Sequence, residues 1–413
     1  MKTQRFLLLL VLTAVLPALA QDSSGVRSVG SISNQDWRAA LAVAVQNNYA
    51  YIGTGATGLS VIDASDPTHP YQVGCWESHF CVDVAVIGGY AYVASDSGLR
   101  ILDVSDPTQP HEVGFWESYV ADAVAVDGNY AYGGGSESPF SIADVSDPSR
   151  PVEVGSYYTG GLGDIAIVGS YAFLAVYKGG LVVMDISDPT HPSQVGIWGA
   201  YNAAGVTVVG NYAYLTCGSD GLYVVDVSDP TQPQVVGQYD TPGHALSIAV
   251  IGGYVCVADY SDGLRVVDVS DPTEPFEVGY YDTPGNTANV TVGVDGLVYV
   301  ADYYSLGIYD CSEAMSAPTD PATNHPMSFC LNPAFPNPFN STTTIAYALP
   351  RPGRFALDVV DLNGQIVTRL SDGWKQAGSY REVWNTNGLV SGVYLARLAS
   401  ERESVSSLMI LMK

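Results

Sequence analysis

The chain is strongly acidic: its 413 residues include 42 acidic and 16 basic side chains, for a formal net charge of −26. The charge is uneven, since residues 21–330 hold 36 acidic and six basic side chains, whereas residues 331–413 hold six acidic and eight basic ones. A body this acidic repels nucleic acid and anionic lipid surfaces, so we exclude both as partners.

Residues 1–20 have the pattern of a secretory signal peptide. A short basic stretch is followed by an apolar run from Phe6 to Leu16 and by small residues that end at Ala20, the expected cleavage position. No later apolar stretch is long enough to span a bilayer as a helix. We therefore expect an exported protein without a transmembrane segment.

Residues 21–313 contain a tetrad, Asp-x-Ser-Asp, that recurs about every 41 residues, a period typical of propeller repeats. Each unit holds four short runs rich in β-branched and aromatic residues, separated by Gly, Asn, Asp or Pro. Four antiparallel strands per unit predict an all-β fold, a β-propeller. The copies begin at Asp63, Asp103, Asp144, Asp185, Asp226 and Asp268, with a degenerate seventh at Asp310.

The fourth strand of each unit carries a Val-Gly pair, and the first pair precedes the first complete unit. It lies within Val26–Ser33, whereas the seventh tetrad has no such strand after it. Pairing the spare N-terminal strand with the incomplete last unit removes an exposed sheet edge. We therefore predict seven blades closed by an N-terminal strand. The glycines are Gly30, Gly74, Gly114, Gly155, Gly196, Gly237 and Gly279.

The third strand of each unit resembles a known repeat. Leu181–Asp185, Leu222–Asp226 and Leu264–Asp268 are similar to the LVIVD repeat of secreted bacterial propellers. The resemblance covers roughly residues 26–313, which is the span of the seven predicted units. It implies a propeller architecture and leaves the function open.

After a Pro-rich linker at 314–334, residues 335–413 follow a different pattern, of longer strands without the tetrad. They predict a small Ig-like β-sandwich. Pro336–Asn340, Ser391–Tyr394 and Leu408–Lys413 resemble the type IX secretion sorting domain, type A, which is similar to the Ig-like domain of the flagellar hook-capping protein. That resemblance implies delivery across the outer membrane to a bacterial surface or beyond, with the secretion machinery as a partner of residues 335–413.

The six cysteines are too scattered for a disulfide scaffold. Two pairs are candidates for disulfides in an exported protein, Cys75 with Cys81 and Cys311 with Cys330, against the alternative of free or buried thiols. Cys217 and Cys256 are interpreted as small buried apolar residues.

The face of the propeller that carries the Ser-Asp-Pro turns is uniform from blade to blade. Asp and Ser side chains that hydrogen-bond the backbone ahead of a proline explain this motif as turn chemistry. Calcium is the alternative, since carboxylates suit hard cations, although each turn supplies few oxygen ligands. We expect no cofactor.

The opposite face varies, with aromatic and polar loops of the kind that bind ligands on rigid scaffolds. We predict that this face binds a protein or a glycan. The candidate residues are Trp37, His79, Tyr119, Tyr158, Trp198, Tyr201, His244 and Asn286.

No motif for a catalytic nucleophile, a phosphate loop or a transition-metal site is present. Asp83 and Asp164 begin inner strands and are expected to face the central channel, as a carboxylate pair or as a solvated wall. We predict a non-enzymatic binding module. A secreted hydrolase or lyase with its site at the channel mouth, and a structural envelope component, remain alternatives.

Overall fold

The fold is known from a computed structural model. It describes residues 23–34, 37, 39–55, 57–77, 80–117, 122–136, 138–200, 202–316, 330–331, 334, 337, 339, 341–349, 353–362, 364–375, 378–386, 389–400 and 404–412. The predicted signal peptide with Ala20, and most of the predicted linker, lie outside these residues. Within the described part of the chain, no helix is long and apolar enough to cross a membrane.

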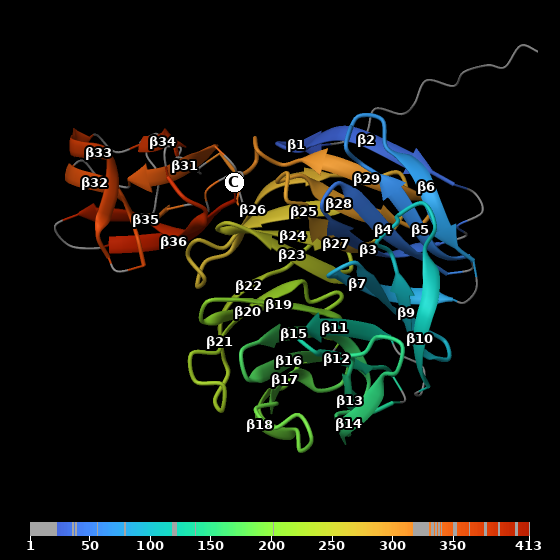
Figure 1. The fold of residues 1–413 in the computed structure, drawn as a ribbon. Coiled ribbons are helices and arrows are strands. Elements are labelled where there is room, and N and C mark those ends of the chain that lie inside the picture. Colours follow the sequence, from blue (N-terminus) through green and yellow to red (C-terminus); the bar gives the residue numbers. More distant parts are fainter. Residues whose placement is uncertain are drawn as a thin grey trace, which may run out of the picture.

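Seven antiparallel sheets are arranged around a central axis in Figure 1, which confirms the predicted propeller. The first strand of each sheet is innermost and contacts the first strands of its neighbours. Blades 1 to 3 consist of β3 (Ala40–Gln46), β4 (Tyr49–Thr54), β5 (Gly58–Asp63), β6 (Tyr71–Trp76); β7 (Cys81–Ile87), β8 (Tyr90–Ser95), β9 (Gly98–Asp103), β10 (His111–Glu117); β11 (Ala123–Asp127), β12 (Tyr130–Gly134), β13 (Phe140–Asp144) and β14 (Val152–Tyr157).

Blades 4 to 6 repeat the same order of strands along the chain. They consist of β15 (Leu162–Val168), β16 (Tyr171–Val176), β17 (Gly180–Asp185), β18 (Ser193–Trp198); β19 (Gly205–Val209), β20 (Tyr212–Thr216), β21 (Leu222–Asp226), β22 (Gln234–Tyr239); β23 (Ser247–Ile251), β24 (Tyr254–Ala258), β25 (Leu264–Asp268) and β26 (Phe276–Tyr281).

Blade 7 joins the two ends of the propeller. Its inner strands are β27 (Thr287–Val292), β28 (Val298–Asp302) and β29 (Ser305–Asp310), and its fourth strand is β2 (Arg27–Ser33) from the N-terminus. This confirms the predicted closure (Figure 1). One feature was not predicted: β1 (Ser23–Ser24) pairs with β26, so blade 6 has a fifth strand.

A glycine on the fourth strand of a blade receives the Ser-Asp-Pro turn of the next blade. A Cβ atom at Gly196 would lie 2.1 Å from the Pro230 carbonyl oxygen, and one at Gly30 would lie 2.1 Å from that of Pro67. Real Cβ atoms do not come closer than about 3 Å to such an atom, so these positions require glycine. The same contact joins Gly74 to Pro107, Gly114 to Pro148, Gly155 to Pro189, and Gly237 to Pro272. The tetrad and the Val-Gly pair are therefore two halves of one inter-blade contact.

The C-terminal unit is a β-sandwich of two sheets, as predicted. One sheet has the order β30 (Cys330–Leu331), β31 (Thr342–Leu349), β34 (Gly378–Asn385). The other has the order β33 (Ile366–Lys375), β32 (Gly353–Val360), β35 (Gly392–Ser400), β36 (Ser404–Leu411). The core between them includes Phe339, Trp384 and Tyr394, whose rings pack against one another.

The structure contradicts the candidate disulfide between Cys75 and Cys81 and does not test the one between Cys311 and Cys330. Cys75 is exposed and Cys81 is fully buried, and both have free thiols. They lie at opposite ends of the connection between blades 1 and 2, so one side chain faces solvent while the other packs into the core. Cys311 is also buried with a free thiol, in a cluster of blades 6 and 7; the Cys330 side chain lies outside the described residues.

Candidate functional site

The turn face, defined by the Ser-Asp-Pro turns, uses its carboxylates locally. Asp66 Oδ1 accepts hydrogen bonds from the Thr68 backbone N–H at 3.0 Å and from the Thr68 hydroxyl at 2.6 Å. These bonds hold the pKa of Asp66 below its usual value. Equivalent backbone bonds recur in the other five complete tetrads, which accounts for the motif as turn chemistry. Among the described residues, no three His, Cys, Asp or Glu side chains come together as potential metal ligands.

The opposite loop face, made by the second-to-third-strand loops and the inter-blade loops, is organised by two buried aspartates. Asp259 Oδ1 accepts the Thr241 hydroxyl at 2.7 Å, and its Oδ2 accepts the Gly243 N–H at 2.8 Å. In the next blade, Asp302 accepts from Thr283 at 3.1 Å and from Gly285 at 2.9 Å. Burial raises the pKa of both carboxyls. Each Asp therefore clamps a Thr-Pro-Gly inter-blade loop onto its own blade.

The residue after each clamping aspartate is a tyrosine with an unusual backbone. Tyr260 and Tyr303 have φ values of 50° and 47°, in the left-handed region that bulky residues avoid. Both form the bridge to the first strand of the following blade, to Thr287 and Ala40 respectively. In blade 5 the corresponding bridge residue is Gly218, with φ 55°. Glycine adopts this conformation freely, whereas tyrosine does not.

These tyrosines come together on the loop face, after the second strands of blades 6 and 7. The Tyr260 and Tyr303 ring centroids lie 6.2 Å apart at an interplanar angle of 76°, and those of Tyr303 and Tyr304 lie 6.2 Å apart at 68°. Tyr304 is 59% exposed. Burial and a hydrogen bond to Tyr260 raise the pKa of Tyr303. We call Tyr260, Tyr303 and Tyr304 the tyrosine cluster.

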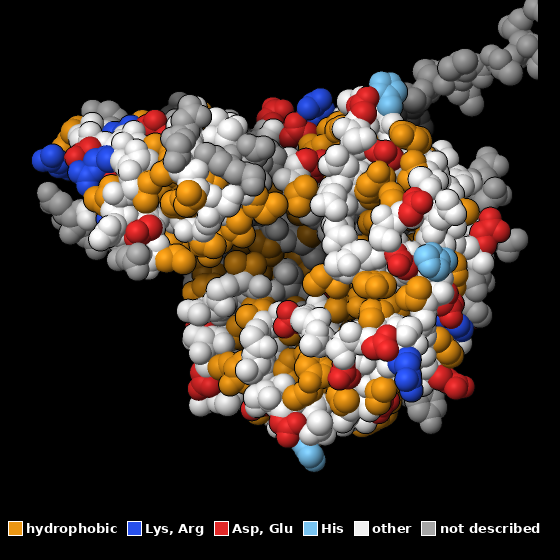
Figure 2. Space-filling view, in the orientation of Figure 1, with side chains coloured by type: hydrophobic (Ala, Val, Ile, Leu, Met, Phe, Trp, Pro, Cys, Tyr) orange, Lys and Arg blue, Asp and Glu red, His pale blue; other side chains and the backbone are white. Residues whose placement is uncertain are grey.

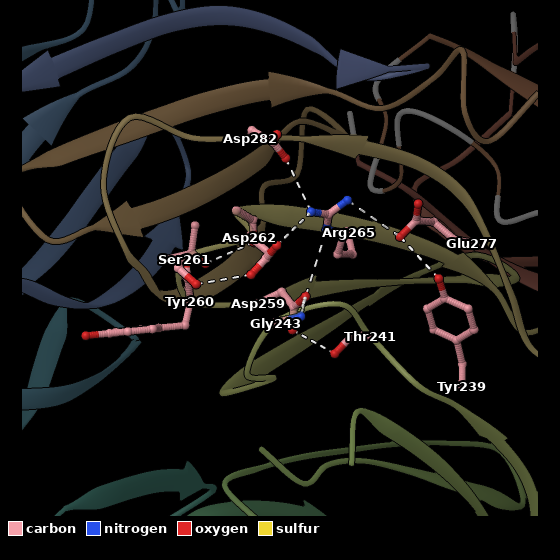
Figure 3. Close-up of polar contacts among 12 residues, drawn as sticks. Tyr239, Thr241, Gly243, Asp259, Tyr260, Ser261, Asp262, Arg265, Glu277 and Asp282 are labelled. Carbon is pink, nitrogen blue, oxygen red and sulfur yellow. Dashed lines mark hydrogen bonds and ion pairs between the residues drawn. The ribbon is translucent and has the colours of Figure 1, made fainter. Parts of the chain in front are cut away.

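A buried arginine and four carboxylates lie beside this cluster (Figure 3). Arg265 approaches Asp282 at 3.3 Å and Asp262 at 3.7 Å. It approaches Asp259 at 3.8 Å and Glu277 at 3.9 Å. Four acids around one guanidinium leave a net negative charge here. In Figure 3 the Tyr260 ring points away from the group, which leaves the ring outside this network.

Two further carboxylates lie on the innermost strands. Asp83 accepts the N–H groups of Val84 at 2.9 Å and, from the next blade, of Val124 at 2.8 Å. Asp164 accepts those of Ile165 at 2.7 Å and Val206 at 2.9 Å in the same way. Burial raises the pKa of Asp83 to about 6. Burial is the main cause, and the charge of Asp83 the second, that raises the pKa of Asp164 to about 7. Both oxygens of each carboxylate therefore bind backbone N–H groups, one in the same blade and one in the next blade.

Comparison with known families identifies both units of the chain. The LVIVD repeat matches residues 38–77, 81–117, 120–159, 160–199, 200–241 and 242–283. These ranges cover more than half of the chain. The chain belongs to the LVIVD-repeat family. Blade 7 lies outside the matched ranges, because its fourth strand comes from the other end of the propeller and its tetrad is degenerate.

The sandwich of this LVIVD-repeat protein matches the secretion system C-terminal sorting domain over residues 333–412. The protein is therefore exported to the cell surface or the extracellular space through its type IX sorting domain, which interacts with the secretion machinery. In Figure 2 acidic side chains are scattered over the propeller, and basic side chains are visible on both the sandwich and the propeller.

Solved structures resemble the propeller in fold alone. A chain in the crystal structure of the mitotic checkpoint complex has a TM-score of 0.55 at 11% identity, covering 75% of this chain and 99% of that one. BamB from Moraxella catarrhalis has a TM-score of 0.49 at 16% identity, covering 69% of this chain and 97% of its own. No curated protein matches the chain in sequence.

The candidate residues of the variable face have different environments in the LVIVD-repeat protein. Trp37 was wrongly assigned to the surface, because it is 1% exposed and packs in the core between blades 7 and 1. Trp198 is half-buried, with its ring 5.0 Å from that of Tyr223. Tyr158 is 73% exposed. His79, Tyr119 and Tyr201 lie outside the described residues.

Two candidates lie in the inter-blade loops that the clamps hold. His244 is exposed and lies over Gly218, where a Cβ atom would come within 2.6 Å of its ring. Asn286 is half-buried at the matching position one blade later, before Thr287. The sequence analysis missed the tyrosine cluster beside them. The repeated triplet Ala-Asp-Tyr, at 258–260 and 301–303, is the signal that marks it.

A separate pocket of about 490 Å³ is lined by Glu117 at the end of blade 2 and by residues from the second to the fourth strand of blade 3. Its lining is largely backbone and serine, with Glu117 and Glu153 as the charged side chains. It contains neither a predicted candidate residue nor a member of the tyrosine cluster.

Proposed function

We propose that this LVIVD-repeat protein is an exported, non-enzymatic binding module whose tyrosine cluster engages a positively charged segment of a partner protein. The left-handed backbone of Tyr260 and Tyr303 carries this proposal. A bulky residue in that conformation costs about 1–2 kcal/mol, and such strain is typical of functional sites. Glycine occupies the corresponding position of blade 5 without strain, so the backbone conformation itself does not require a tyrosine.

The geometry of the cluster favours a cation. Its rings stand nearly perpendicular to one another, so a bound ammonium or guanidinium group can contact more than one ring face. The neighbouring group of four carboxylates around Arg265 adds negative potential. A neutral glycan would gain the ring contacts without the charge complementarity, so we favour a Lys- or Arg-bearing protein segment.

The axial carboxylates support a binding role more than a catalytic one. Asp83 and Asp164 have the raised pKa values of an acid–base pair. Both oxygens of each, however, are occupied by backbone N–H donors of two adjacent blades. Their geometry is explained by the joining of neighbouring inner strands, so no proton-transfer role is needed to account for it.

The proposal is tested by measuring binding of residues 21–413 to immobilised Lys- and Arg-rich peptides and to neutral oligosaccharides. The double variant Tyr260→Gly/Tyr303→Gly is expected to bind the basic peptides about tenfold more weakly, and higher salt should weaken binding by the native protein. Tyr158→Ser, which removes an exposed tyrosine outside the cluster, is the matched control.

Two outcomes contradict the proposal. Basic peptides that bind the double variant as tightly as the native protein would show that the rings are not the contact surface. Oligosaccharides that bind while basic peptides do not would assign the face to glycans instead.

A further inference from the structure

The blade junctions of the propeller share a packing rule. An aromatic ring on the second strand of one blade packs in the same buried cluster as the variable second residue of the tetrad in the next blade. For example, Tyr214 of blade 5 packs with Val269 of blade 6. The other pairs that obey the rule are Tyr51 with Val104, Tyr92 with Val145, Tyr132 with Ile186, Phe173 with Val227, and Tyr299 with Ala64.

The junction between blades 6 and 7 departs from this rule at both positions. The second-strand residue is Cys256 and the tetrad residue is Cys311, and both are fully buried in one cluster. Their side chains are in hydrogen-bonding contact, which together with burial raises the pKa of the Cys311 thiol. Cysteine thus replaces an aromatic ring and its aliphatic partner at the same contact.

The same junction also lacks the proline that locks the other blades. The tetrad of blade 7 continues as Glu313-Ala314 in place of Asp-Pro. A Cβ atom at Gly279 would therefore meet the Ala314 side chain at 2.5 Å and the Ser24 carbonyl oxygen at 2.8 Å. Here the N-terminal segment and the last strand of the propeller meet, so this junction holds both ends of the ring.

We propose that Cys256 and Cys311 form a disulfide in the exported protein, which staples blade 6 to the end of blade 7. Formation breaks two S–H bonds and makes one S–S bond. The two electrons and two protons pass to the disulfide of a thiol-oxidising protein, which leaves as a dithiol. Export places the chain where such oxidants act and where disulfides persist.

The disulfide forms before the ring closes. In the folded propeller both sulfurs are inaccessible, and the raised pKa of Cys311 disfavours the thiolate that exchange requires. Before blade 7 has docked on blade 6 the junction is open, so the sulfurs are accessible at that stage of folding. The bond closes a loop of about 55 residues, large enough for a substantial stabilisation.

The position of the bond suits a mechanical role. Cys311 directly follows β29, the strand that pairs with the N-terminal β2, and it precedes the connection to the sorting domain. Force on the sorting domain therefore reaches the propeller through the segment just after Cys311, where the Ala314 N–H donates to the Gly25 carbonyl. A covalent link to blade 6 at Cys311 keeps β29 in place when the tail is pulled.

The test compares the full chain exported into an oxidising compartment with the same chain retained in a reducing cytosol. Each is denatured in iodoacetamide without reductant, digested and analysed by mass spectrometry. A linked peptide pair containing Cys256 and Cys311 is expected in the exported protein and alkylated cysteines in the cytosolic one. Alkylation of both in the exported protein, or a Cys311–Cys330 link, would overturn the proposal.

Thermal unfolding provides a second readout. Reductant is expected to lower the unfolding midpoint of the exported protein by roughly 5 °C and to have no effect on Cys256→Ala. Cys217→Ala is the matched control, because Cys217 is equally buried and should retain the reductant sensitivity. If Cys256→Ala fails to fold, Cys311→Val replaces it in this test. Valine is the second residue of four other tetrads, so it fits this position. Equal reductant sensitivity in native protein and variant excludes the bond.

Discussion

At the scale of single residues, the loop face combines two opposite uses of side chains. Asp259 and Asp302 are buried so that their carboxylates can clamp loops, which is a structural role. The tyrosines that follow them, Tyr260 and Tyr303, occupy a backbone conformation that favours glycine. The first pair therefore holds the scaffold rigid, and the second presents rings at its edge.

The strain at Tyr303 leads to a prediction about stability. Tyr303→Gly removes a left-handed tyrosine, and the relief offsets the lost ring contacts, so we expect the free energy of unfolding to change by less than about 1 kcal/mol. Tyr299→Ala, which truncates a 2%-exposed core ring, should lower it by about 3–5 kcal/mol. Urea unfolding measures both. If Tyr303→Gly lowers the free energy of unfolding as much as Tyr299→Ala does, Tyr303 contributes to stability as a core residue.

The axial aspartates lead to a prediction about pH. Asp83 and Asp164 have folded-state pKa values of about 6 and about 7, above that of an unfolded aspartate. The folded state therefore binds these protons more tightly, so this stabilisation is fully present below about pH 4 and is lost as the pH rises to about 7. Asp164→Ser keeps a hydroxyl acceptor for the Val206 N–H. At the corresponding position of blade 6, the Ser247 hydroxyl accepts the Val290 N–H in the same way.

We expect Asp164→Ser to reduce the fall in thermal midpoint between about pH 5 and about pH 8. Asp188→Ser is the control. The pKa of Asp188 is lowered by its turn hydrogen bonds, so its contribution is lost only as the pH falls below about 4. A native protein whose midpoint rises between pH 5 and pH 8 would contradict the assignment.

At the scale of elements, the blades are joined by the contact of a strand glycine with a proline carbonyl. Gly196→Ala places a Cβ atom 2.1 Å from the Pro230 oxygen, so blades 4 and 5 must separate locally. We expect a loss of about 1–3 kcal/mol in the free energy of unfolding, measured with urea. Gly199→Ala, where a Cβ atom meets nothing within 4 Å, should leave stability nearly unchanged. Equal effects of the two changes would show that the contact is not the cause.

At the scale of the whole molecule, the ring depends on strand β2. Deleting residues 21–33 leaves the β29 edge without a partner and exposes the core beneath it. We expect the amount of soluble monomer to fall and the thermal midpoint to decrease. Size-exclusion chromatography measures the first and calorimetry the second. Deleting residues 21–24 removes only β1, which has two paired residues, and should have little effect. A closed monomer after the longer deletion would show that the ring does not require β2.

How much was predictable differs between the fold and the site. The tetrads and the Val-Gly pairs are local and repeated, so they predicted the blade count, the strand order and the closure by β2. Trp37 was misplaced because sequence variability marks a loop without showing which way a ring turns, and this one turns into the core. The Ala-Asp-Tyr triplets mark the tyrosine cluster in the sequence, but they do not show its left-handed backbone, since φ cannot be derived from residue type.

The sequence alone determined that this protein is an acidic, exported propeller with a sorting domain, because repeats and terminal motifs are properties of residue order. Only the tertiary structure decided which distant residues meet. It brought Cys256 to Cys311, set each strand glycine against the proline of the next blade, and placed two strained tyrosines side by side. The reason is physical: closing a ring of blades creates junctions between residues more than about 30 positions apart, and no local pattern encodes those contacts.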